Sequence, residues 1–324
     1  MRRKVGLAQT GDRRENVRKS MDLVRDDLTL RLADQVLLKP NFLSSTNQLA
    51  STHADAIRGV IDFLLSTDTP PKEILITEGA NEAFSGEAFQ NFAYSGLAND
   101  YDVPIHLIDL HQETAWQEET IYLADWETYQ VRMPKLVLDC PCTISVAVAK
   151  THDVDVVTLA LKNMIMGTLH QDDRVKMHGY LTHGDRQRPR EAQILNMNLT
   201  RISHHLSPHI GVIDGTVGLQ GNGPGGTNSV DLDIAVASAD VFAADAVVTK
   251  AMGFNPWDIG LFQYATEIGL GIADLERIQV IGTHSLEEVT IPFEPHQWID
   301  QQYQWQEPKA RDYLQLQALS LIHI

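Results

Sequence analysis

The stretch from Thr143 to His183 constrains the fold more than any other part of this 324-residue chain. It opens with TISVAVAK, an almost unbroken run of small and β-branched apolar residues, which predicts a buried strand that ends at Lys150. Apolar residues at 156–169 then recur close to helical spacing, which predicts a helix that carries Lys162 and Asn163. A buried strand followed by such a helix is the repeating unit of α/β proteins, so we expect a sheet flanked by helices.

The same alternation recurs along most of the chain. We predict strands at residues 3–9, 36–41, 73–80, 104–109, 143–150, 209–214, 232–238 and 277–283. We predict helices at residues 12–30, 52–64, 84–97, 156–169, 190–206, 239–253 and 258–269. Two short strand candidates, TIYLA and YQVRM, lie in the looser region 111–138. This order predicts an α/β fold with a doubly wound, mainly parallel sheet and helices on both faces.

The same pattern suggests how the chain divides. We expect one α/β domain over residues 1–283, with lobes 1–125 and 143–283 as the alternative arrangement. Residues 284–324 are expected to form a C-terminal extension.

Composition disfavours several classes of protein. The formal net charge of −17 disfavours nucleic acid or an acidic membrane as partner. No run of about 18 apolar residues is present, and the N-terminal residues lack the apolar stretch of a signal peptide, so we expect a cytoplasmic protein. Cys140 and Cys142 are too few to hold a cubane iron–sulfur cluster within this chain, and we expect both to be buried.

Polar residues follow the predicted strands at the sheet edge where open α/β folds form ligand crevices. The candidate catalytic residues are His152, Lys162 and Lys150. The candidate ligand-binding residues are Lys39, Asn41, Thr52, His53, Glu78, Asn163, His178, Asp214, Gly221, Gly223 and Gly225. Neighbouring positive charges disfavour protonation, so His152 is expected to stay neutral near pH 7 and act as a base while the lysines hold a carboxylate or phosphate. In the structural alternative, His152 bonds a backbone carbonyl and the lysines pair with Asp153, Glu78 or Asp214.

Two loops are expected to border this crevice. The polar stretch 170–183 has no long apolar run to bury it and is predicted to form a lid. The glycine-rich segment 215–226 follows a strand expected to end at Asp214; it either lets backbone N–H groups approach a phosphate or forms a wide turn over the crevice. Metal binding is a second class of function, with candidate ligands His152, His178 and Asp214, and further donors at His170, Asp172, His183 and Glu78.

Several motifs resemble the DUF362 family, a set of uncharacterised proteins: KPNF (39–42), AKTHD (149–153), VIDGTVGLQGNGPGG (212–226) and DVFAADAVVTKAMG (240–253). The resemblance covers most of residues 35–283. Many members of that family carry a ferredoxin-like cluster-binding segment, and this chain with its two cysteines departs from that pattern. The resemblance therefore implies that any cluster function comes from a partner protein.

The order His152, Lys162, His178 is also similar to that in the nickel-pincer lactate racemase family. This second resemblance implies Lys162 as the tether of a metal cofactor and His152 as the base in proton transfer.

Together these features predict an enzyme, an oxidoreductase or an isomerase, that acts on a small anionic metabolite through Lys and His acid–base chemistry. One alternative is a non-catalytic binding or electron-transfer accessory protein beside an iron–sulfur partner. The other is a racemase-like enzyme with a lysine-tethered metal cofactor. The apolar run 310–324 is expected to dock on the body or on a second subunit, so a homodimer or a redox-protein partner is open. An enzyme should bury the lysines around a cavity, whereas an accessory protein should show a large apolar docking patch.

Overall fold

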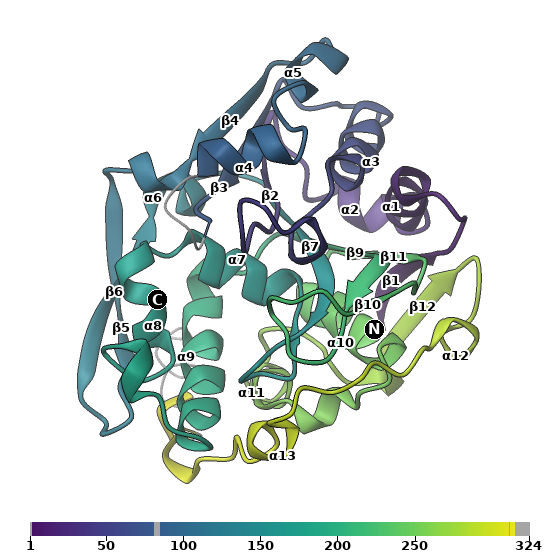
Figure 1. Ribbon diagram of the computed structural model, residues 1–324. Helices are drawn as coiled ribbons and strands as arrows, with labels where there is room; N and C mark the ends of the chain where they lie inside the picture. The colour runs from purple at the N-terminus through teal and green to yellow at the C-terminus, as the bar shows by residue number, and fades with distance from the viewer. Residues whose placement is uncertain (1, 81–84, 311, 315–324) are drawn as a thin grey trace.

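The computed structural model describes residues 2–80, 85–310 and 312–314. Its strands in the main sheet are β1 (Arg3–Ala8), β2 (Gln35–Lys39), β3 (Glu73–Glu78), β4 (Ile105–Asp109), β7 (Thr143–Thr151), β8 (Val157–Thr158), β9 (Ile210–Leu219), β10 (Ser229–Val230), β11 (Ile234–Ser238) and β12 (Ile278–Gly282). Neighbouring strands follow the order β12-β1-β11-β9-β7-β2-β3-β4, while β10 pairs with β9 and β8 with β7. A separate antiparallel hairpin consists of β5 (Trp116–Tyr122) and β6 (Thr128–Pro134), at the left edge of Figure 1.

The main sheet is mostly parallel, as predicted. Along its path only β11 runs against its neighbours, antiparallel to both β1 and β9. The strand β2 pairs directly with β7, so strands from residues 1–125 and from residues 143–283 lie in one continuous sheet. That sheet runs from β4 at the top of Figure 1 to β12 at its right edge.

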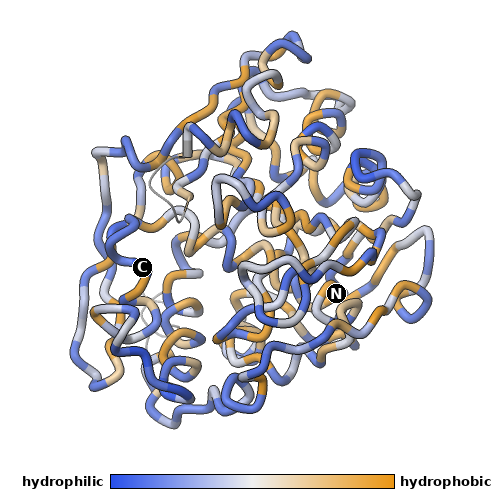
Figure 2. Tube along the Cα trace, in the orientation of Figure 1, coloured by the Kyte–Doolittle hydropathy of each residue, from blue (hydrophilic) through white to orange (hydrophobic). Residues whose placement is uncertain are grey.

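Helices cover both faces of this sheet, which confirms the doubly wound architecture. The helices are α1 (Arg13–Asp22), α2 (Arg25–Thr29), α3 (Ala54–Leu65), α4 (Ser85–Asn91), α5 (Leu97–Asp100), α6 (Lys135–Leu138), α7 (Ala160–Thr168), α8 (Arg174–Met177), α9 (Arg190–Leu206), α10 (Val241–Ala251), α11 (Gly260–Ile268), α12 (Leu286–Val289) and α13 (Ile299–Gln302). On one face α1 and α3 pack together, and on the other lie α7 and α10, each face with its own apolar cluster. Figure 2 shows the apolar segments gathered inside and the polar ones on outer loops.

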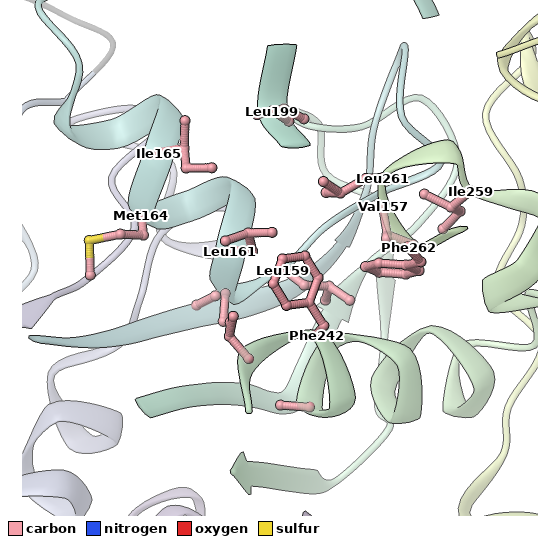
Figure 3. Packing of buried hydrophobic residues seen from close by; sticks show 14 of the residues in the cluster. Val157, Leu159, Leu161, Met164, Ile165, Leu199, Phe242, Ile259, Leu261 and Phe262 are labelled. Atoms are coloured by element: carbon pink, nitrogen blue, oxygen red, sulfur yellow. The ribbon is translucent and has the colours of Figure 1, made fainter. Parts of the chain in front are cut away.

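The helix α7 is the element that positions the site. Its apolar side joins residues of α9, α10 and α11 in the larger cluster, as Figure 3 shows. The first N–H groups of a helix have no partner within the helix, and here Asp245 of α10 supplies one. Its carboxylate accepts hydrogen bonds from the backbone N–H groups of Ala160 (2.9 Å) and Leu161 (3.0 Å). This contact fixes the start of α7 and thereby the place of Lys162 and Asn163.

The structure corrects several predicted boundaries. The predicted helix 12–30 is two helices, because the backbone at Val24 leaves helical geometry (φ −126°) while its side chain is buried in the core. The predicted helix 156–169 begins only at Ala160, since residues 157 and 158 pair with β7 as β8. The strand expected to end at Asp214 continues to Leu219, because β7 and β10 pair with its last residues. The predicted helix 84–97 is split into α4 and α5, and Phe84 lies outside the described residues.

The cap of α3 is also different from the prediction. Its N-cap is His53, whose Nδ1 accepts a hydrogen bond from the backbone N–H of Asp55 (3.1 Å). The predicted cap, Thr52, instead links the chain just after β2 to the middle of β7: its hydroxyl donates to the carbonyl oxygen of Val146 (2.7 Å) and accepts from the N–H of Asn41 (2.8 Å).

Three further expectations concern the cysteines, the C-terminal run and membrane spans. Both cysteines are free and buried, as predicted. In the C-terminal run, Ala310 and Leu314 are buried against the body, and residues 311 and 315–324 lie outside the described part. No helix in the described part is long and apolar enough to cross a membrane.

Candidate functional site

A cavity of about 680 Å³ lies at the carboxyl ends of β2, β3 and β7. Its wall includes Asn41, Glu78, Lys150 and His152 from the strand ends and Lys162 and Asn163 from α7. The remaining wall comes largely from residues 171–186, which overlap the segment 170–183 that was predicted as a lid. That segment is not an irregular loop: it holds α8 and the short 3₁₀ helices Gln171–Asp173 and His183–Asp185. That this segment opens and closes as a lid remains a prediction.

Lys39 lies behind the cavity wall as part of a buried ion pair. Its Nζ is 2.5 Å from Oε1 of Glu78, 2.6 Å from the carbonyl oxygen of Pro40 and 3.1 Å from Oδ1 of Asn163. Burial lowers the pKa of Lys39, and the charge of Glu78 opposes this. The partners come from β3 and α7, so Lys39 ties three elements together. For Lys39 this agrees with the structural alternative, in which a lysine pairs with Glu78.

Lys150 faces the cavity and has different partners. Its Nζ donates hydrogen bonds to Oδ1 of Asn41 and to the carbonyl oxygen of Ala50 (2.9 Å). Burial lowers the pKa of Lys150 to about 7, with Lys39 and Lys162 acting in the same direction and Glu78 against them. The neighbouring lysines therefore do lower the pKa of Lys150, as expected, but burial lowers it more.

His152 is held as a neutral ring with its proton on Nε2. Its Nδ1 accepts hydrogen bonds from the backbone N–H of Val154 (3.0 Å) and from Nζ of Lys162 (3.1 Å). Asp153 also lies 3.2 Å from this nitrogen, but a backbone N–H can only donate, so Nδ1 must carry the lone pair. Burial and the charge of Lys162 keep the pKa of His152 well below its usual value. Lys162 in turn is 3.5 Å from the carboxylate of Asp155.

His178 is held as the opposite tautomer. Its Nδ1 lies 2.7 Å from Oε1 of Glu191, a fully buried carboxylate that also binds Arg186. Burial raises the pKa of Glu191, but His178 and Arg186 lower it by more. Glu191 is therefore ionised and accepts a hydrogen bond. The proton of the neutral His178 ring therefore lies on Nδ1, which leaves the lone pair on Nε2. Burial lowers the pKa of His178 despite Glu191, so the ring is neutral near pH 7.

The two imidazole rings lie side by side on the cavity wall. Their centroids are 6.4 Å apart and their planes differ by 25°. Because the tautomers are opposite, His152 presents a hydrogen-bond donor at Nε2 and His178 presents a proton acceptor at Nε2. This arrangement can donate a hydrogen bond and remove a proton from one small ligand.

Seven of the predicted site residues do not line this cavity: Lys39, Thr52, His53, Asp214, Gly221, Gly223 and Gly225. His53 and Asp214 line a second, smaller cavity of about 260 Å³ together with Arg13, whose Nε is 2.9 Å from the Asp214 carboxylate. Thr52 is buried between Asn41 and Val146 of β7. The structure therefore does not bring Asp214 together with His152 and His178. Within the described residues, no group of three or more His, Cys, Asp or Glu side chains is placed to hold a metal ion.

The glycine-rich segment lies across the end of β7. Gly221 has φ +72°, and its carbonyl oxygen accepts a hydrogen bond from the Thr151 hydroxyl (2.9 Å). A Cβ on Gly223 would lie 2.1 Å from the carbonyl oxygen of Thr151, so only glycine fits there. Pro224 lines the cavity, and a Cβ on Gly225 would meet Leu43 at 3.3 Å. The packing favours the wide turn, and phosphate binding by this segment stays a prediction.

Residues far along the chain complete the site. The side-chain amide of Gln302 donates to the carbonyl oxygen of His152 (2.9 Å) and accepts from the N–H of Val156 (2.8 Å). Arg188 binds the carboxylate of Asp153 (3.3 Å) and lies 3.5 Å from the centroid of the Trp298 ring. These residues, together with Glu191, Arg186 and Arg174, were not predicted as site residues, because nothing in their local sequence pattern separates them from surface polar residues.

Comparison with known proteins places the chain in a family. Residues 36–250, well over half of the chain, match the model of a domain of unknown function, DUF362. The chain is 23% identical over 274 residues to the thylakoid-associated protein sll1697 of Synechocystis sp. (strain ATCC 27184 / PCC 6803 / Kazusa), which covers 81% of this chain and 78% of that protein. The resemblance to lactate racemases found no support in these comparisons. The chain belongs to the DUF362 family.

Proposed function

We propose that this protein is an enzyme that moves a proton on a small anionic metabolite, a carboxylate or a phosphate, inside the cavity. The observation that carries the proposal is the pair of neutral imidazoles of His152 and His178, which have opposite tautomers, on one cavity wall. Buried groups with perturbed pKa values in a cleft are typical of acid–base sites.

The chemistry follows from the tautomers. His178 takes a proton at Nε2 from a carbon next to a carbonyl or carboxylate group, and Glu191 stabilises the imidazolium that forms. His152 donates its Nε2 hydrogen bond to the oxygen that gains negative charge. Lys162 holds His152 in the required tautomer. Returning the proton from His178 to the neighbouring carbon on the same face gives an isomer without any net oxidation. An oxidoreductase would need a redox cofactor in addition.

The wall of the cavity supports an enzyme over an accessory protein. Lys150 and Lys162 are buried around it, as expected for an enzyme. The large apolar side chains exposed in the described part are Leu30, Leu181, Trp257, Ile291 and Tyr303, and they are scattered over several elements. This distribution does not favour a docking patch for an electron-transfer partner.

Deuterium exchange tests the proposal directly. The protein is incubated in D₂O with small 2-hydroxy and 2-oxo carboxylates and their phosphate esters, and proton NMR follows the loss of the C–H signal beside the carboxylate or the carbonyl group. We expect exchange with at least one compound, loss of exchange by about 100-fold or more in His178→Asn and His152→Asn, and no change in His205→Asn. His205 is a matched control because it also contacts a carboxylate, that of Glu119, but lies outside the cavity. Exchange that survives in both cavity variants would refute the proposed roles.

Native mass spectrometry with elemental analysis separates the remaining alternative. Lys162 reaches the cavity beside His152, which is where a tethered metal cofactor would be attached in the racemase-like reading. A mass adduct that maps to Lys162 would favour that reading. A bare mass together with deuterium exchange would support catalysis by the side chains alone. Cytoplasmic location and the absence of a membrane partner remain predictions, since the relative from Synechocystis is named for thylakoids.

A further inference from the structure

Buried cations around the cavity differ in whether a carboxylate neutralises them. Lys39 has Glu78 at 2.5 Å and Lys162 has Asp155 at 3.5 Å. In the described part of the chain, Lys150 has no carboxylate oxygen within 4.0 Å. A buried charge without a partner is costly, so such a group either stays neutral or acquires a counter-ion.

The direct partners of the Lys150 amine carry no charge. They are two neutral hydrogen-bond acceptors, Oδ1 of Asn41 and the carbonyl oxygen of Ala50. A protonated amine has three N–H donors, and these two acceptors leave one donor unused. The side chain is 1% exposed and lines the cavity, so a bound ligand is the available partner for that third donor.

We propose that Lys150 binds the anionic group of the ligand, and that Lys150 takes up a proton from solvent when the anion binds. The inference rests on the proposed function only in taking the cavity as the ligand site. It assigns the carboxylate or phosphate to one lysine and leaves Lys39 as a structural ion pair. It also predicts that ligand binding is coupled to pH.

The charged groups that act on Lys150 set the expected size of this coupling. Glu78 on β3 favours its protonation, while Lys39 on β2 and Lys162 on α7 disfavour it, and burial outweighs all three. Arg174 on α8 lines the same cavity and adds positive charge, with its N–H groups on backbone carbonyl oxygens, among them Leu169 (3.0 Å). Without ligand the pKa of Lys150 is lowered to about 7. Anion binding should therefore take up about 0.1 proton at pH 6, about 0.5 at pH 7 and about 0.9 at pH 8.

Isothermal titration calorimetry with sulfate and with oxalate measures this uptake. Both probes are fully ionised between about pH 6 and pH 8, so any proton taken up goes to the protein. Titrations in two buffers of different ionisation enthalpy give the number of protons at each pH. We expect the uptake to rise with pH as stated and the affinity to fall about tenfold from pH 6 to pH 8.

Variants assign the proton to Lys150. Lys150→Met should abolish the uptake and weaken binding at pH 6 by about 10- to 100-fold, the range for a lost charge-assisted hydrogen bond. Lys150→Arg, which keeps the charge, should bind without proton uptake. Lys176→Met is the matched control, because Lys176 lines the same cavity but is less buried. His152→Asn should leave the uptake unchanged, which separates this proposal from the proposed catalytic roles.

Three outcomes would overturn the inference. They are no binding of either anion at millimolar concentration by the folded wild-type protein, binding without proton uptake at about pH 8, and uptake that persists in Lys150→Met. Because none of these measurements requires turnover, failure of the deuterium exchange assay would leave the test of Lys150 intact. Thermal unfolding of each variant shows whether it is folded, and the wild-type proton count stands on its own if Lys150→Met is not.

Discussion

The buried pair Lys39–Glu78 allows a quantitative test of how the site is held together. Glu78→Gln keeps an acceptor for the Lys39 amine and for the backbone N–H of Phe42, which now bonds the same oxygen at 2.9 Å. It removes the negative charge and puts an amide NH2 group in place of the other carboxylate oxygen. Both side chains are at most 1% exposed, so Lys39 must then stay charged without a counter-ion or lose its proton. Breaking a buried pair in this way costs about 3–5 kcal/mol of the free energy of unfolding.

Urea unfolding followed by tryptophan fluorescence measures that cost, and a double-mutant cycle apportions it. Lys39→Met alone leaves Glu78 unpaired, so it should also destabilise by several kcal/mol. The double variant Lys39→Met/Glu78→Gln should be destabilised by less than the sum of the two singles, because no buried charge is left unpaired.

The exposed pair Lys72–Asp34 serves as the control. Its N–O distance is 2.7 Å, similar to that of the buried pair, but its side chains are 76% and 74% exposed. Lys72→Met should change the free energy of unfolding by no more than about 0.5 kcal/mol. The reasoning would be refuted if Glu78→Gln unfolded within about 1 kcal/mol of the wild type, since burial would then not govern the strength of this pair.

Three further predictions follow from other contacts. Gln302→Leu removes both hydrogen bonds to the loop of His152 and should lower the rate of deuterium exchange by about 10-fold or more, with a shifted pH profile, while the fold is retained by circular dichroism. Burial raises the pKa of Asp245 from 3.8 to about 7, so the folded protein holds this proton more tightly than the unfolded chain. The stability it contributes is complete below about pH 4 and lost as pH rises through 7, and Asp245→Asn should therefore reduce the loss of urea stability between about pH 5 and pH 8. Gly223→Ala places a methyl group against the carbonyl oxygen of Thr151 and should destabilise by about 1–3 kcal/mol in the same urea assay.

Much of the fold could be predicted from local pattern. Strand β7 and helix α9 match their predicted positions closely, because a run of small and β-branched apolar residues and a long amphipathic repeat are strong signals. The errors fall where a tertiary contact outweighs local preference. Thr52 is a better cap than His53 by propensity, yet its hydroxyl is taken by Val146, so the cap moves on by one residue.

The candidate site could be predicted only in part, and for a physical reason. The strand ends showed which polar residues would meet, because the carboxyl ends of parallel strands share one edge. The tautomers of His152 and His178 could not be predicted, since they depend on Glu191 and on one backbone N–H. Asp214 was expected at the same edge, but β9 continues past it and Arg13 pairs with it on another side.

The C-terminal segment has a consequence for how relatives should be compared. The region that matches the family model ends at residue 250, yet Gln302 holds the backbone of His152 and Trp298 stacks on Arg188 beside Asp153. In Figure 1 this segment runs from α12 at the right of the molecule to α13 at its bottom. Two family members could therefore share every residue of the matched region and still differ in the rigidity of the loop that carries the histidine. Differences in selectivity among relatives would then depend on residues outside the region 36–250 that matches the family model.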